Sequence, residues 1–219
     1  MSHRPAEHGD GRVVAAFDVD GTLTTRDCVR PFLELLGGRR SILAALARVP
    51  HRTLGAAVRL DRDRMKDVVV GGVYAGRSVD QVDAEGRAFA DVVFDTMLRP
   101  DMLARLRWHQ SMGHRTVIVS ASLRSYVDPL AASLGVERAL CTDVMSAAGR
   151  YLGSLDGPNC RAAEKVVRLR AWLAAEQLDD VPIWAYGDSA GDRDMLAAAH
   201  HPVWVKGTTV TAVPREEQG

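Results

Sequence analysis

Residues 13–24 read VVAAFDVDGTLT, and this stretch decides the fold of the chain. Its first part, residues 13–17, is a short apolar run that predicts a buried β-strand ending at Asp18. Asp20 follows two positions later, and two carboxylates this close repel each other unless a cation or a proton intervenes. Magnesium is a hard ion that prefers oxygen ligands. The stretch therefore predicts a strand with a candidate Mg²⁺ site at its carboxyl end.

Two further residues of this stretch are suited to a loop that binds an anion. Gly21 would allow a sharp turn directly after the strand, and Thr22 offers a hydroxyl or a backbone N–H group. The alternative interpretation is purely structural: Asp20 and Gly21 form a turn, and Asp18 caps a helix. Taken alone, the Asp-x-Asp-Gly pattern fits both interpretations about equally well.

The rest of the chain alternates short apolar runs with segments of helical periodicity. The predicted strands are 13–17, 116–119, 139–142, 183–186 and 203–205, and the predicted helices between them are 101–112, 123–134, 162–176 and 192–199. Strands that are apolar on both faces and alternate with helices indicate a parallel sheet with helices on both sides. We therefore expect an α/β fold with a Rossmann-like parallel sheet core. Gly149 and Gly153 predict a protruding hairpin over residues 143–155.

Three of the apolar runs end in a polar residue that could carry chemistry, namely Asp18, Ser120 and Asp188. In an open parallel sheet, ligands bind outside the carboxyl ends of the strands, so these residues should converge on one site. The Ser120 hydroxyl and the backbone N–H groups that follow it, beginning at Ala121, would form a phosphate seat near a helix start. Alternatively, Ser120 or Ser122 is simply the N-cap of that helix.

The C-terminal half contributes two more candidates. Asp192 lies four residues after Asp188, one helical turn on, so both carboxylates could hold a cation against Asp18. Lys165 could neutralise phosphoryl oxygens and a neighbouring carboxylate as a point charge. The structural alternatives are helix capping by Asp192 or Ser189 and a solvated lysine on a helix surface.

Residues 28–98 have a different pattern from the rest of the chain. Apolar residues recur there at helical spacing, as in Ile42, Leu43, Leu46 and Val49, and then Leu54, Val58 and Leu60. Residues 28–78 contain ten Lys or Arg and four acids, a charge of +6 in a chain of zero formal net charge. We therefore predict a helical cap over 28–98, a core formed by 12–27 and 99–212, and flexible tails at 1–11 and 213–219.

The composition excludes several classes of protein. Hydrophobic residues make up 47% and charged residues 26% of the chain, as in ordinary soluble domains. Zero net charge gives no general attraction to nucleic acid, and the absence of an 18-residue uncharged apolar run argues against a membrane span. Cys28, Cys141 and Cys160 have neither disulfide nor zinc-site spacing, which indicates a reducing, cytoplasmic location. The basic insert could steer an anionic substrate, contact an anionic membrane weakly, or be a solvated face. The sequence does not determine the oligomeric state.

In combination and in this order, these elements resemble the motifs of the haloacid-dehalogenase superfamily of phosphohydrolases. Motif one is similar to residues 18–22, motif two to Ser120, motif three to Lys165 and motif four to residues 187–192. The resemblance extends from about residue 13 to residue 205. The helical insert resembles the cap of the phosphoserine-phosphatase-like branch, subfamily IB. Within that branch, Ser-Ala-Ser at motif two is similar to the bacterial group that includes phosphatidylglycerophosphatase C.

The resemblance implies a Mg²⁺-dependent phosphatase. Asp18 would be the nucleophile that forms an aspartyl-phosphate, and Asp20 would act as general acid and then general base. Asp18 and Asp188 would bind Mg²⁺ through carboxylates and Asp20 through its backbone carbonyl, while Asp192 would act through water or as a support. The transferring phosphoryl group would be stabilised by Ser120, Lys165 and backbone N–H groups near residues 19–22.

The resemblance leaves the substrate open. Phosphoserine phosphatases carry a Glu nine residues after the nucleophile, which holds the substrate amine, and this chain has the shorter Asp27 there. They also usually have Ser where this chain has Gly21. We therefore expect a phosphorylated small molecule or a lipid head group as substrate, rather than phosphoserine. Other possible functions are a phosphotransferase with the same covalent intermediate, a non-enzymatic phosphate-binding protein, and a lipid-surface protein that depends on its basic insert.

Overall fold

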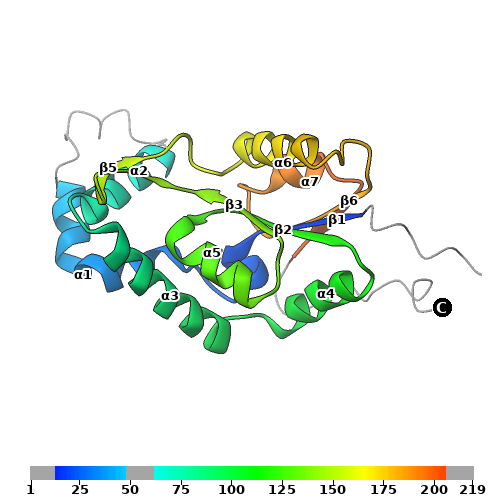
Figure 1. Ribbon diagram of the computed structural model, residues 1–219, viewed down its shortest axis with the longest axis horizontal. Helices are drawn as coiled ribbons and strands as arrows, with labels where there is room; N and C mark the ends of the chain where they lie inside the picture. Colours follow the sequence, from blue (N-terminus) through cyan, green and yellow to red (C-terminus); the bar gives the residue numbers. More distant parts are fainter. Residues whose placement is uncertain (1–12, 48–61, 206–219) are drawn as a thin grey trace, which may run out of the picture.

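A computed structural model of the chain describes residues 13–47 and 62–205. Its centre is a five-stranded sheet in the order β3-β2-β1-β6-β7, and all neighbouring pairs are parallel (Figure 1). The strands are β1 (Val14–Phe17), β2 (Arg115–Leu123), β3 (Arg138–Thr142), β6 (Ile183–Gly187) and β7 (His201–Trp204). The predicted α/β fold with a parallel sheet core is confirmed.

Alternate residues of the central strands belong to different hydrophobic clusters, because successive side chains of a strand point to opposite faces. Phe17 of β1 and Ile118 of β2 lie in one cluster, and Ala16 and Val119 lie in the other. All four side chains are fully buried. Since both faces of the sheet are covered, β1 and the segment 117–119 of β2 are apolar at every position, as is typical of parallel sheets.

Helices cover the two faces of the sheet in pairs. Helices α4 (Pro100–Ser111) and α5 (Arg124–Ser133) lie on the face of Phe17, and α6 (Ala163–Ala175) and α7 (Arg193–Ala197) lie on the opposite face (Figure 1). Leu106 of α4 packs in the cluster of Phe17, and Leu173 of α6 packs in the cluster of Ala16. These helices begin and end within two residues of the predicted positions.

Strand β2 extends four residues beyond its predicted end at residue 119. The pairing with β3 shifts register between Ser120 and Leu123, which oppose the consecutive residues Cys141 and Thr142. The strand therefore bulges over residues 120–122 before it pairs again. A polar Ser-Ala-Ser segment resembles a strand end in sequence, but the long-range pairing with β3 continues past it.

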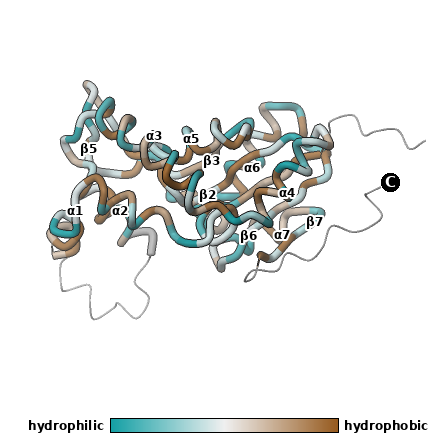
Figure 2. The backbone as a smooth tube through the Cα atoms, turned by 90° about the horizontal axis from the view of Figure 1, so that it is seen from below, coloured by the Kyte–Doolittle hydropathy of each residue, from teal (hydrophilic) through white to brown (hydrophobic). Residues whose placement is uncertain are grey.

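A second group of elements lies at one end of the sheet (Figure 2). It comprises helices α1 (Val29–Ala47), α2 (Arg62–Tyr74) and α3 (Val79–Thr96). The predicted helical character of residues 28–98 is therefore present in most of the described part of this range, with a turn over residues 75–78 between α2 and α3. The predicted helical positions Val49, Leu54, Val58 and Leu60 and the predicted tails 1–11 and 213–219 lie outside the described residues.

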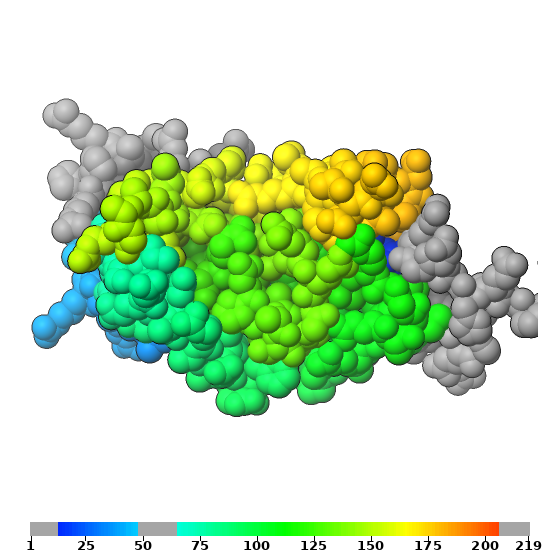
Figure 3. Space-filling view, in the orientation of Figure 1, coloured from blue at the N-terminus to red at the C-terminus, as the bar shows by residue number. Residues whose placement is uncertain are grey.

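The hairpin predicted over residues 143–155 is present as β4 (Val144–Ala147) and β5 (Arg150–Leu155). It packs against the cap: a Cβ atom on Gly71 of α2 would lie 2.2 Å from the carbonyl oxygen of Gly153. The N–H group of Tyr151 donates to the carbonyl of Arg77 at 3.0 Å. In Figure 3 the surface of the hairpin continues into that of the cap helices. The division into a core of 12–27 and 99–212 and a cap of 28–98 stays a prediction.

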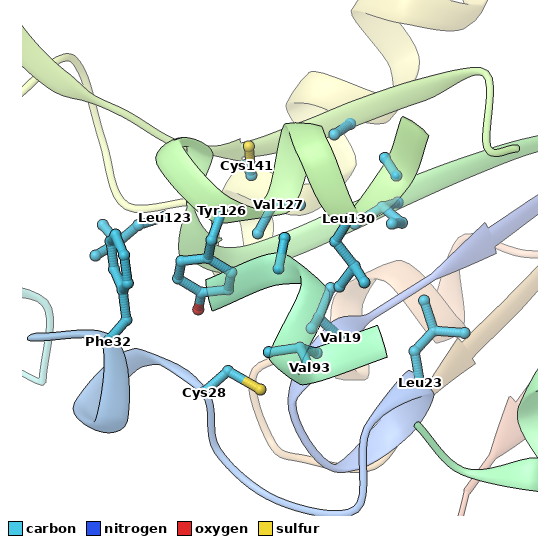
Figure 4. Close-up of a cluster of buried hydrophobic side chains, with 14 of the residues drawn as sticks. Val19, Leu23, Cys28, Phe32, Val93, Leu123, Tyr126, Val127, Leu130 and Cys141 are labelled. Carbon is cyan, nitrogen blue, oxygen red and sulfur yellow. The ribbon is translucent and has the colours of Figure 1, made fainter. Parts of the chain in front are cut away.

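The cap is joined to the core by an aromatic contact (Figure 4). The ring of Phe32 in α1 lies 4.9 Å from that of Tyr126 in α5, and Phe89 of α3 lies 5.3 Å from the same tyrosine. The two connecting segments run side by side, because Arg99 donates its backbone N–H group to the carbonyl of Leu23 at 2.9 Å. No helix among the described residues is long and apolar enough to cross a membrane.

His109 of α4 is a titratable group inside the core. Its side chain is fully buried, its Nε2 atom lies 2.8 Å from the hydroxyl of Tyr186, and its ring packs edge-on against Phe17. The pKa of His109 is lowered to about 3, mainly by burial, with smaller contributions from the nearby charges of His114 and Arg105. The ring therefore stays neutral in the folded protein at neutral pH.

This burial predicts a specific dependence of stability on pH. In the unfolded chain a histidine has a pKa of about 6.5, so below that pH the unfolded state takes up a proton that the folded state does not. His109 should therefore reduce the free energy of unfolding by up to about 1.4 kcal/mol for each pH unit below 6.5. His109→Gln should weaken this dependence, measured by urea denaturation between pH 7.5 and 5. Parallel pH profiles for the two proteins would refute the assignment.

Candidate active site

A buried ion-pair network lies at the carboxyl ends of β1 and β6. The Nζ atom of Lys165 in α6 lies 2.6 Å from Asp18 Oδ1 and 2.5 Å from Asp192 Oδ1, and Lys165 is 2% exposed. The other oxygen of Asp192 accepts hydrogen bonds from the backbone N–H group and the hydroxyl of Ser189, at 3.0 and 2.7 Å. The interpretation of Lys165 as a solvated surface residue is therefore wrong.

Two glycines allow the carboxylates to approach each other. Gly21 has a φ of +79°, and a Cβ atom there would lie 2.2 Å from Asp188 Oδ2. A Cβ atom on Gly187 would lie 2.4 Å from the Cβ atom of Asp192. The Thr22 hydroxyl donates to Asp188 Oδ1 at 3.3 Å. The loop after β1 and the loop after β6 are therefore packed so closely that no side chain fits between them.

Asp20 is held from two directions. Its Oδ1 atom accepts a hydrogen bond from the backbone N–H group of Cys28 at 2.8 Å, and its Oδ2 atom accepts one from the hydroxyl of Ser122 at 2.5 Å. The interpretation of Ser122 as an N-cap is wrong, because Leu123 occupies the N-cap of α5 and makes no side-chain capping bond. The carboxylate of Asp20 is thereby oriented by the bulge of β2 and by the start of the cap.

The electrostatics of the network favour a cation. The pKa of Asp18 is raised to about 7, mainly by burial; Lys165 lowers it, and the carboxylates of Asp192 and Asp20 raise it. Burial also raises the pKa of Asp188, and Asp192 adds to that effect. Burial disfavours the charged form of Lys165, but Asp18 and Asp192 outweigh it, so the pKa of Lys165 is raised and the amine stays charged. The single positive charge of Lys165 does not balance the negative charges of the surrounding carboxylates when all of them are ionised.

The carboxylates have the chemistry and spacing of a divalent-metal site. Oxygen atoms of Asp18, Asp188 and Asp192 all lie within 4.8 Å of one another. An all-oxygen set of this kind fits Mg²⁺, which binds through one or two carboxylates and several waters. Both oxygens of Asp192 already have partners, which fits its predicted role as a support. Asp20 lies outside this group, and its predicted contribution is a backbone carbonyl.

The residues predicted to bind phosphate are only partly brought together. Ser120 is buried in the bulge of β2, and its hydroxyl accepts the N–H group of Ser122 at 3.2 Å. The carbonyl of Ala121 accepts a hydrogen bond from Lys66 of the cap. Asp27 is exposed and caps α1, since its carboxylate accepts the N–H group of Arg30 at 3.1 Å. Asp27 is therefore separate from the ion-pair network.

Several residues near the site were not singled out in the sequence. Lys66 Nζ lies 2.9 Å from the side-chain oxygen of Asn159, which also accepts the hydroxyl of Thr142 at 2.8 Å. Arg99 donates to the carbonyl of Gly21 at 3.3 Å and pairs with Asp101 at 2.8 Å. Lys66 is one of the ten basic residues of segment 28–78, and no local pattern distinguishes it from the other nine.

Known proteins are similar to this chain in sequence and in fold. The profile of the haloacid dehalogenase-like hydrolases matches residues 15–197. The chain belongs to this family. Protein CicA of Caulobacter vibrioides is 38% identical over 195 residues, which cover 88% of this chain and 86% of CicA. A probable phosphatase of Mycobacterium tuberculosis is 28% identical over 87% of this chain and 67% of its own. The chain is accordingly a phosphatase.

A solved structure has a fold similar to that of this chain. A substrate-bound phosphoserine phosphatase structure aligns with a TM-score of 0.60 over 85% of this chain and 82% of its own. The sequence identity is 15%, so this likeness concerns the fold. The fold of the chain is therefore similar to that of this phosphoserine phosphatase.

The packing of Gly21 predicts a selective loss of activity. In Gly21→Ala, the new methyl group should displace the carboxylate of Asp188, the end of a side chain that can rotate away. Misplacement of a reacting group by about 1 Å can cost about 10²-fold in rate, so kcat should fall at least that far. The measurement is release of inorganic phosphate from p-nitrophenyl phosphate.

Gly113→Ala is the matched control, because Gly113 has a φ of +72° and nothing within 4 Å of its added Cβ atom. Both variants carry the same left-handed backbone strain of about 1–2 kcal/mol. Both should therefore lose a similar amount of thermal stability, while Gly113→Ala keeps its activity. Equal activity in the two variants would show that the contact of Gly21 with Asp188 is unimportant.

Proposed function

We propose that the protein hydrolyses phosphomonoesters in a Mg²⁺-dependent reaction that passes through an aspartyl-phosphate on Asp18. The observation that carries the proposal is the buried contact of Lys165 with Asp18 and Asp192. A carboxylate held beside an ammonium group, with further carboxylates next to it, is suited to attack a phosphoryl group once a divalent cation offsets the excess negative charge.

Asp18 and Asp20 have different catalytic roles in this proposal. An oxygen of Asp18 attacks phosphorus and forms the aspartyl-phosphate, while the bond from phosphorus to the ester oxygen breaks. Asp20 gives a proton to that oxygen, and the alcohol leaves. Asp20 then takes a proton from a water molecule, which attacks phosphorus, releases inorganic phosphate and restores the carboxylate of Asp18.

The other residues bind and orient. Lys165 and the Ser120 hydroxyl stabilise the charge that spreads over the phosphoryl oxygens, together with the N–H groups around Gly21. Asp18 and Asp188 would hold Mg²⁺ through their carboxylates, with Asp192 as a support fixed by Ser189. The bound ion would supply charge neutralisation at the phosphoryl oxygens.

Replacement of the nucleophile should separate activity from folding. Asp18→Asn keeps an oxygen acceptor for Lys165 but cannot form the acyl phosphate, so turnover of p-nitrophenyl phosphate should fall by about 10³-fold or more. The melting temperature should change little. Asp95→Asn, an exposed substitution on α3, is the control and should behave as the unmodified protein. Retained turnover in a pure Asp18→Asn sample would exclude Asp18 as the nucleophile.

Metal removal should abolish turnover reversibly. Chelation leaves the carboxylates around Lys165 without a balancing cation, so phosphate release should stop and resume on addition of Mg²⁺ or Mn²⁺. Calcium should inhibit, because its larger and looser coordination misplaces the nucleophile. The readout is the rate of phosphate release after dialysis against chelator. Full activity after exhaustive chelation would contradict the metal requirement.

A further inference from the structure

A cavity of about 810 Å³ opens between helices α1 and α2 of the cap. Its wall is mainly hydrocarbon and includes Leu33, Ile42, Leu43, Leu46, Val69 and Val70. Leu43 leaves 64% of its surface exposed, and such apolar surface is stabilised when a ligand covers it. Cavities of about 300–1,000 Å³ lined in this way are typical of sites for whole organic ligands.

The cavity adjoins the proposed catalytic centre through two of its own lining residues. Lys66 lines it and donates to the carbonyl of Ala121, the residue before Ser122. Asp27 also lines it and precedes Cys28, whose N–H group donates to Asp20. Each of these two residues thus borders a group that holds the carboxylate of Asp20.

The position of Asp20, the proposed general acid, indicates that the leaving group would extend toward this cavity. Asp20 protonates the ester oxygen, so the alcohol part of the substrate must lie on the side of Asp20. Cys28, one of the two donors to Asp20, lies between the lining residues Asp27 and Val29. Ser122, the other donor, follows Ala121, whose carbonyl accepts a hydrogen bond from the lining residue Lys66. A leaving group that extends away from Asp18 past Asp20 therefore reaches α1 and α2.

We infer that the natural substrate is a phosphomonoester of an alcohol with a large hydrocarbon part, which occupies the cavity between α1 and α2. This inference rests on the proposed function. The lining also includes the charged residues Arg30, Glu34 and Arg39. A small leaving group, such as an amino acid, would fill little of the volume and would leave the apolar part of the wall uncovered. Lys66 lies where the phosphate and the hydrocarbon part would meet and is positioned to contact the polar end of the substrate.

The test compares alkyl monophosphates of increasing chain length, used below the concentration at which they aggregate. In the unmodified protein kcat/KM should rise with chain length by up to about fourfold per buried methylene, the equivalent of about 0.8 kcal/mol. Leu43→Glu introduces a charge into the wall and should lower kcat/KM for octyl phosphate at least tenfold, while glycerol phosphate turnover stays unchanged. Leu35→Glu is the matched control, an exposed leucine of α1 that does not line the cavity.

The possible results distinguish a failure of this inference from a failure of the proposed function. Flat kcat/KM across chain lengths, with glycerol phosphate still hydrolysed, overturns the hydrocarbon site and leaves the phosphatase mechanism standing. An equal effect of the Leu35 and Leu43 substitutions on octyl phosphate also overturns it. Absence of turnover for every phosphomonoester overturns the proposed function itself.

A last comparison identifies the source of the hydrocarbon. The same kcat/KM series is measured with a two-chain lipid phosphomonoester in neutral vesicles and in vesicles with anionic lipid. Turnover in vesicles that Leu43→Glu abolishes supports a membrane lipid as the substrate. Turnover of the dispersed alkyl phosphates alone, with the same Leu43 dependence, supports a soluble amphiphile.

Discussion

The burial of Lys165 between Asp18 and Asp192 is the interaction on which the rest of the site depends. A charged group inside a protein is tolerated only when it is paired and hydrogen-bonded, and removal of one partner leaves an uncompensated charge. Asp18 follows β1, Lys165 lies in α6, and Asp192 precedes α7. The two ion pairs of Lys165 therefore depend on a fold in which β1 lies beside β6 and both helices lie on the same face of the sheet.

The same network also explains why the site is suited to bind ions. Lys165 neutralises part of the negative charge, and burial keeps the pKa of Asp18 and of Asp188 raised. Groups with perturbed pKa values gather at functional sites because the fold holds them where isolated groups would not stay ionised. Gly21 and Gly187 have no side chain, and a Cβ atom at these positions would displace Asp188 and Asp192, respectively.

The cap contacts the catalytic residues directly, in addition to its covalent connection to the core. Asp20 is held by the N–H group of Cys28, where the cap begins, and by Ser122 in the bulge of β2. Phe32 and Tyr126 fix α1 against α5 nearby. The start of the cap at Cys28 is consequently in direct contact with the proposed general acid.

The sequence by itself determined the fold class and most element boundaries, because hydrophobic periodicity is a local property. It also placed Asp18 and Asp188 at strand ends, where the topology of parallel sheets makes ligand sites. Only the tertiary structure decided that Lys165 is buried, that Ser122 orients Asp20 and that Lys66 contacts the bulge of β2. Lys165 and Asp18 are 147 positions apart, and Lys66 and Ala121 are 55 apart. Local sequence patterns carry no information on contacts between residues so far apart in the chain. A solvated lysine and a buried lysine therefore look identical in the sequence, and only the order of the strands brings the partners of the buried lysine to it.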